Sequence, residues 1–151
     1  MSDLKSETEA LKKAKAEEFA SACPSRVIEM ALEDLEAVED NPKYQINMLF
    51  WHDPMDEGEC AVCFAGGVMA MRLGLPSDKA YCEQFDAATE CRLLALNDFR
   101  CGEIYLGLEL MGVAAAVSLP SFQCVTRYHD SPTQFKSDMR SLAEMLKKKG
   151  L

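Results

Sequence analysis

Apolar residues recur at helical spacing in three stretches of the chain, each preceded by a helix start signal. Residues 24–40 begin with Pro24, which suits a first helical turn, and Asp86 is a good N-cap for residues 87–100. Ser131-Pro132 opens a third stretch. The apolar face of the first stretch is formed by Ile28, Ala31, Leu32, Leu35 and Val38. The pattern predicts three amphipathic helices.

The most apolar segment is Gly58 to Leu75, and its side chains are apolar all the way round a helical projection. Acidic residues precede it, and Gly74 followed by Leu75-Pro76 is a helix stop signal. A helix without a polar face is buried on most sides. We therefore predict a central helix over residues 60–74. Small residues on one flank, Gly66-Gly67 above all, allow another backbone to approach closely.

The remaining segments carry weaker patterns. Residues 1–23 are charged and Ala-rich with few apolar positions, which predicts a helical extension whose start frays. Residues 103–111 fit either a strand or a helical face, and we favour a short helix because the neighbours are helical. Residues 44–50 and 122–128 alternate and suggest a small two-stranded element. The expected fold is a mostly α, compact single-domain bundle over residues 24–151.

The charge of the chain excludes one class of partner. Its 151 residues carry a net charge of -9, and a surface that binds phosphate backbones must be basic. Such acidity suits a partner with a basic patch, or serves only solubility. No apolar run approaches the roughly 20 residues of a membrane span, and the N-terminus shows no signal peptide. We expect a cytoplasmic protein with no membrane partner, and self-association stays open.

The polar face of residues 24–40 is the first candidate site. It carries six acids and no base after Arg26, and the proposed contact residues are Glu29, Glu33, Glu36, Glu39 and Asp40. Such a row could imitate phosphates and occupy a protein that handles nucleic acids. The alternative is an ordinary solvated helix face.

Cysteine chemistry is the second candidate. Cys60 and Cys63 have the spacing of half a zinc site, but no second close pair of ligands follows. A nucleophile at this helix start would need His52 or His129 nearby. A redox pair is favoured by the helix start but opposed by three nearby carboxylates, which would raise the thiol pKa. With Trp51 and His52 just upstream, a pocket is expected here. The alternative is a pair of structural thiols, and we expect neither cofactor nor resident metal.

Four motifs stand out in and after the segment from Pro42 to Leu75, namely Tyr44 to Met48, Trp51, Cys60 to Gly66 and Asp98 to Gly102. In these motifs the chain resembles, over roughly residues 25–105, a family of small uncharacterised proteins encoded by tailed bacteriophages. It implies a protein that works in the cytoplasm of an infected bacterial cell. Small acidic phage proteins often inhibit or adapt a host protein, which is an analogy and transfers no functional residue.

Together these observations predict an acidic, non-enzymatic protein that binds and modulates a host protein with a basic surface. The alternative is a cysteine-dependent enzyme or metal-binding protein centred on Cys60 and Cys63.

Overall fold

A computed structural model describes residues 2–48, 52–54, 60–75, 85–113 and 126–151. Within these ranges the helices are α1 Ser2–Ser21, α2 Pro24–Glu39, α3 Phe64–Met71, α4 Ala87–Arg100, α5 Ile104–Leu110 and α6 Pro132–Lys148. The strands are β1 Tyr44–Ile46, β2 His52–Pro54 and β3 Cys60–Val62. The mostly α architecture predicted from the sequence is confirmed.

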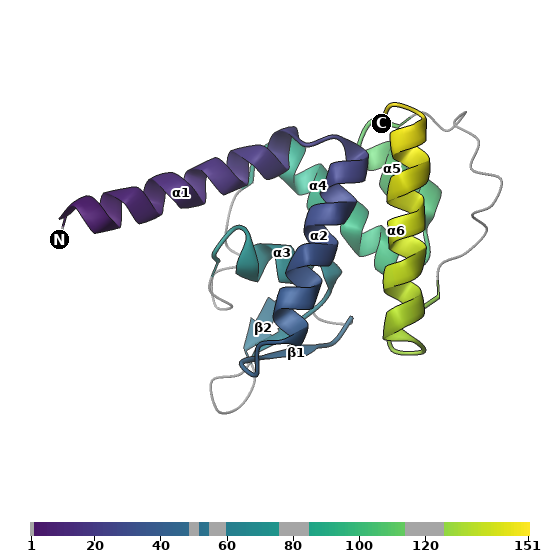
Figure 1. The fold of residues 1–151 in the computed structure, drawn as a ribbon, viewed down its shortest axis with the longest axis horizontal. Coiled ribbons are helices and arrows are strands. Elements are labelled where there is room, and N and C mark those ends of the chain that lie inside the picture. The colour runs from purple at the N-terminus through teal and green to yellow at the C-terminus, as the bar shows by residue number, and fades with distance from the viewer. Residues whose placement is uncertain (1, 49–51, 55–59, 76–84, 114–125) are drawn as a thin grey trace.

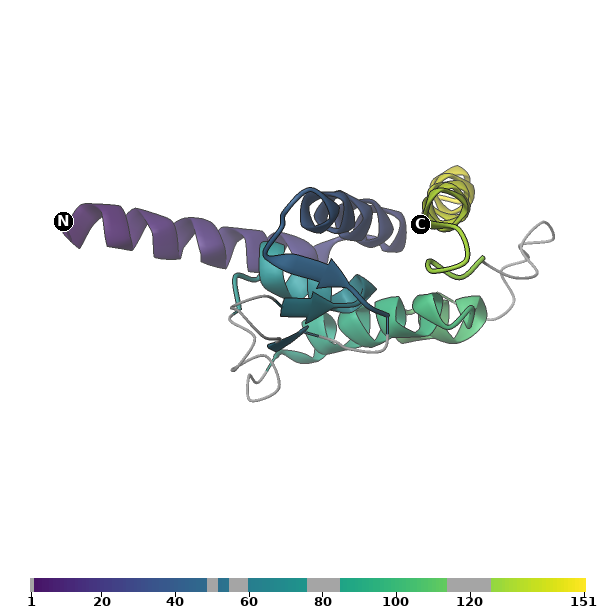
Figure 2. The ribbon, with the colours of Figure 1, turned by 90° about the horizontal axis from the view of Figure 1, so that it is seen from below.

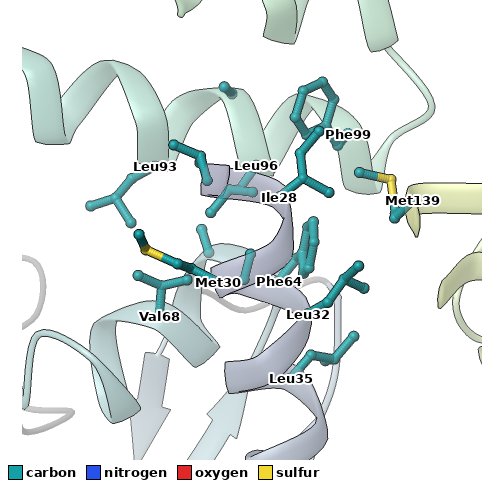
Figure 3. Packing of buried hydrophobic residues seen from close by; sticks show 14 of the residues in the cluster. Ile28, Met30, Leu32, Leu35, Phe64, Val68, Leu93, Leu96, Phe99 and Met139 are labelled. Carbon is teal, nitrogen blue, oxygen red and sulfur yellow. The ribbon is translucent and has the colours of Figure 1, made fainter. Parts of the chain in front are cut away.

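The core is organised around α2, which packs against α3, α4 and α6 (Figure 1). Its apolar face is buried, as the helical spacing predicted, and it meets residues from all three neighbours (Figure 3). The residues that these helices contribute to the core include Phe64 and Val68 of α3, Leu93, Leu96 and Phe99 of α4, and Met139 of α6. The rings of Phe64 and Phe135 pack edge to face with centroids 5.3 Å apart. Each fully buried side chain of this size contributes about 1.5–3 kcal/mol relative to leaving it exposed.

The predicted central helix over residues 60–74 is wrong in its first turn and at its end. Residues 60–62 form strand β3, and α3 runs only from Phe64 to Met71. β3 is the middle strand of its sheet and continues into a buried helix. A buried strand reads as an unbroken apolar run, and periodicity cannot distinguish it from a buried helix.

The small β element is also different from the prediction. The described residues form a three-stranded sheet in the order β1-β3-β2. β1 runs parallel to β3 with Tyr44 opposite Cys60, and β2 runs antiparallel with His52 opposite Val62. Residues 44–46 are therefore a strand as expected, but their partner is β3 rather than residues 122–128. Of that second segment, 122–125 lie outside the described residues and 126–128 are not a strand.

The predicted helix boundaries hold elsewhere. The Asp86 side chain accepts a hydrogen bond from the Thr89 N–H at 2.7 Å, and Ser131 caps α6 through the Gln134 N–H. The short helix favoured for residues 103–111 is present as α5. α4 ends before Gly102, whose φ of +83° lies in the left-handed region that favours glycine.

The N-terminal part of helix α1 projects from the body, and the helix docks from about Lys12 to its C-terminal end (Figures 1 and 2). Phe19 is fully buried, whereas every residue from 4 to 15 is exposed. The helix therefore rests on the bundle at its C-terminal end. Among the described residues, no helix combines the length and apolar character needed to cross a membrane.

Candidate functional site

The acidic face of α2 lies against a row of basic side chains from α6. The cross-helix ion pairs are Glu29 with Lys147, Glu36 with Arg140, and Glu39 with Lys136. The N–O distances of the first and last pairs are 2.9 and 2.8 Å. We call these three pairs the α2–α6 seam. Residues 24–40 carry six acids and one base, and residues 132–151 carry five bases and two acids, so each helix neutralises much of the other.

Arg72, just after α3, binds two further acids of α2. Its Nε donates to Asp34 Oδ2 at 2.9 Å, and its second terminal nitrogen reaches Glu33 Oε2 at 3.1 Å. Glu33 also pairs with Arg26 at 3.1 Å. Asp34 is almost fully buried, and this burial raises the pKa of its carboxyl to about 6 although Arg72 opposes the shift. Asp34 is thus part of the packing between α2 and α3, not of the outer acidic face.

The end of α2 is held by Tyr128, whose hydroxyl donates to Glu39 Oε2 at 2.7 Å. Burial, followed by the neighbouring Glu39 carboxylate, raises the pKa of Tyr128 well above its usual range. Asp40 follows as the C-cap and is exposed. All five proposed contact residues therefore lie along one helix, but four of them already bind side chains of the same chain.

An open groove of about 340 Å³ runs between α2 and α6. Four carboxylates line it together with two bases of the seam, namely Glu29, Glu33, Glu36, Glu144, Arg140 and Lys147. Glu33 and Glu36 remain 55% and 47% exposed at the side chain although both are paired. Glu144 is exposed and forms no ion pair with a described residue. This groove is where the acidic face is open to solvent.

Cys63 is the N-cap of α3. Its Sγ accepts a hydrogen bond from the Gly66 N–H at 3.4 Å, and the residue is fully buried. Burial raises the pKa of the Cys63 thiol, which opposes formation of the thiolate needed for nucleophilic attack. In this environment the Cys63 side chain serves helix capping and packing.

The other members of the expected pocket are only partly described. His52 and Cys60 occupy neighbouring strands, where Pro54 lies opposite Cys60 in the register. Trp51 lies outside the described residues. Within the described ranges, no three His, Cys, Asp or Glu residues are grouped in a way that could hold a metal ion.

His129 has a role in joining two parts of the fold. Its Nε2 accepts a hydrogen bond from the Met48 N–H at 3.2 Å, and its ring packs edge to face with Tyr128 at 5.5 Å. The nitrogen that a general base would use is occupied by this backbone contact. His129 thereby ties the segment after β1 to the turn before α6.

The basic row of α6 and the role of Arg72 were not predicted from the sequence. Lys136, Arg140 and Lys147 follow one another at intervals of four and seven residues, which places them on one helix face. That spacing was a usable signal for a helix complementary to the acidic one. Comparison with models of protein families, with curated proteins and with solved structures found no match for this chain.

Proposed function

We propose that this chain acts by binding a protein that presents lysine or arginine, through the groove between α2 and α6. The observation that carries the proposal is the cluster of four carboxylates on the walls of one open groove. Glu33, Glu36 and Glu144 stay exposed there and can accept hydrogen bonds from a partner's cationic side chains. The resemblance to phage proteins makes a host protein the expected partner.

Most of the groove carboxylates already form ion pairs within the chain, and these pairs limit the affinity of the proposed binding. A cation from the partner competes with Arg140 for Glu36, and with Arg26 and Arg72 for Glu33, so the net electrostatic gain at these two carboxylates is small. Exposed pairs are also screened by salt over about 8 Å at physiological ionic strength. We expect moderate affinity that falls as salt is raised. A continuous imitation of a phosphate row is less well supported, because the seam already occupies most of the acids that it would use.

The best variant removes groove carboxylates without breaking the seam. Glu36 and Glu39 hold α6 in place through Arg140 and Lys136, so reversing their charge would disturb the fold as well as the site. Glu33→Gln with Glu144→Gln removes two negative charges and leaves all three seam pairs. The matched control is Glu90→Gln with Glu109→Gln, which makes the same charge change on exposed positions of α4 and α5.

The experiment is affinity capture from host-cell lysate at low and physiological salt with the three proteins. We expect at least one lysate protein to be captured by the wild type and by the control but not by Glu33→Gln/Glu144→Gln. Partners captured equally by both double variants would refute a role for the groove. A basic octalysine peptide, titrated by fluorescence anisotropy, provides a second measurement: its affinity should fall only in the groove variant.

A further inference from the structure

The exposed part of α1 has an apolar stripe without a partner in the described chain. Leu4 and Leu11 are 71% and 59% exposed, the highest values among the large apolar residues that the structure describes. They stand seven residues apart, which places them on the same side of the helix. A helix of this length gains little stability from its own hydrogen bonds and normally needs a packed face.

The stripe has the spacing of a two-stranded coiled coil. Leu4, Thr8, Leu11 and Lys15 are separated by four, three and four residues, which are the intervals of alternating d and a positions in a heptad repeat. Both leucines then occupy d, the position where leucine favours two strands. The β-branched Thr8 occupies a, and its hydroxyl is already bonded to the Leu4 carbonyl at 2.8 Å. Lys15 occupies the next a position, where a single lysine fixes the register of the two helices and lowers the stability of the pair.

The flanking charges select the direction of pairing. In this register Glu7 occupies g and Lys12 occupies the following e. In a parallel pair, g of one helix faces e of the other, so Glu7 meets Lys12 of the second copy on both sides. In an antiparallel pair the e positions face each other, which would bring Lys5 close to Lys12. The charges therefore favour the parallel arrangement.

The fold leaves room beside this stripe. Thr8, Leu11 and Lys15 line a hollow of about 350 Å³, whose opposite wall includes Met71 and Gly74. The stem of Lys12 lies against Gly74, so α1 is steadied at this point while its stripe stays open. The N-terminal part of α1 projects past the body, where a second helix can run alongside it (Figure 1).

We propose that α1 is a self-association helix, which pairs in parallel with α1 of a second copy of this chain. Two leucines from each helix become buried, at about 1.5–3 kcal/mol each. Association costs at least about 4 kcal/mol, and the repeat spans only two heptads. The dimer is therefore weak and depends on protein concentration. This inference concerns α1 alone and is independent of the groove between α2 and α6.

Sedimentation equilibrium of the full chain over a wide concentration range tests the proposal. The wild type should shift from the monomer mass of 16.8 kDa toward twice that value as concentration rises. Leu4→Ala/Leu11→Ala should stay monomeric at every concentration, while helix content by circular dichroism is retained because alanine is a strong helix former. Leu106→Ala, at an exposed leucine of α5, is the matched control and should dimerise as the wild type does. A monomeric wild type, or equal dimerisation of the leucine variant, overturns the proposal.

Charge variants test the parallel direction. Glu7→Lys places like charges opposite each other in a parallel pair and should reduce association severalfold, and Lys12→Glu should do the same. The double exchange Glu7→Lys/Lys12→Glu restores opposite charges and should recover the wild-type midpoint concentration. In an antiparallel pair, Lys12→Glu would instead strengthen association through Lys5. That result, or no recovery in the double variant, contradicts the parallel pairing.

Discussion

Arg72 joins the end of α3 to the middle of α2 through the buried carboxylate of Asp34. The guanidinium Nε and one terminal nitrogen bind the two carboxylate oxygens at 2.9 and 3.2 Å. The same terminal nitrogen reaches the Met30 carbonyl at 3.5 Å. A bidentate ion pair of this kind fixes the relative orientation of the two side chains and also stabilises their contact. The pair fixes how the apolar helix α3 sits on the helix that carries the acidic face.

Replacing Arg72 by alanine should be strongly destabilising. The change leaves the Asp34 carboxylate buried without its cation, and breaking such a pair costs about 3–5 kcal/mol. Because Arg72 is not completely enclosed, we expect the free energy of unfolding at pH 7 to fall by an amount near the lower limit of this range. Denaturant unfolding measures the change. Arg26→Ala is the matched control, since its partners Glu18 and Glu33 are exposed and the loss should stay below about 1 kcal/mol. Equal losses in both variants would contradict this account of Asp34.

The same carboxyl predicts a pH dependence of stability. The pKa of Asp34 is about 6 in the folded chain against an ordinary value of 3.8, so the folded state holds a proton that the unfolded state releases in this window. The contribution of Asp34 to the free energy of unfolding therefore rises as the pH falls from above 6 toward 4. Asp34→Asn removes this dependence. Wild type should gain stability relative to Asp34→Asn between pH 7 and pH 4.5, and a difference that stays constant would contradict the raised pKa.

The sequence was sufficient to predict the helices whose start signals and apolar faces lie within the helix itself. α2, α4 and α6 each combine a cap or proline with a repeating apolar face, and each was predicted close to its true bounds. β3 was missed because a three-residue strand leaves no periodicity of its own, and it runs into a helix that is equally apolar.

The candidate site was harder to predict because its state depends on contacts between distant segments. The acidic row of α2 was visible, but its counter-ions lie about 100 residues later in α6, as with Glu36 and Arg140. Cys63 looked like half of a reactive pair, and only the fold shows that its thiol caps α3 from within the core. Pairing and burial of this kind are tertiary properties that a single sequence does not display.

Two buried glycines should respond differently to replacement by alanine. A Cβ on Gly107 would lie 2.5 Å from a ring carbon of Phe99 and 2.9 Å from the Ala95 carbonyl oxygen. Since this forces α5 away from α4, Gly107→Ala should cost about 1–3 kcal/mol. A Cβ on Gly67 would meet Val38 at 3.8 Å, an ordinary contact, and alanine suits a helix interior better by up to about 1 kcal/mol. Gly67→Ala should therefore be neutral or stabilising in the same unfolding assay.

Thiol alkylation of the folded protein should separate the cysteines by environment. Cys23 is exposed, and its Sγ lies 3.4 Å from the Ser25 hydroxyl, a contact that lowers the pKa of the Cys23 thiol. Cys63 is buried with a raised pKa, and Cys101 is an exposed reference thiol. At neutral pH, iodoacetamide followed by peptide mass spectrometry should label Cys23 before Cys101 and leave Cys63 unmodified until the chain unfolds. Ser25→Ala should slow only Cys23. Labelling of Cys63 in the folded chain as fast as Cys101 would contradict its burial and reopen the hypothesis of a cysteine nucleophile.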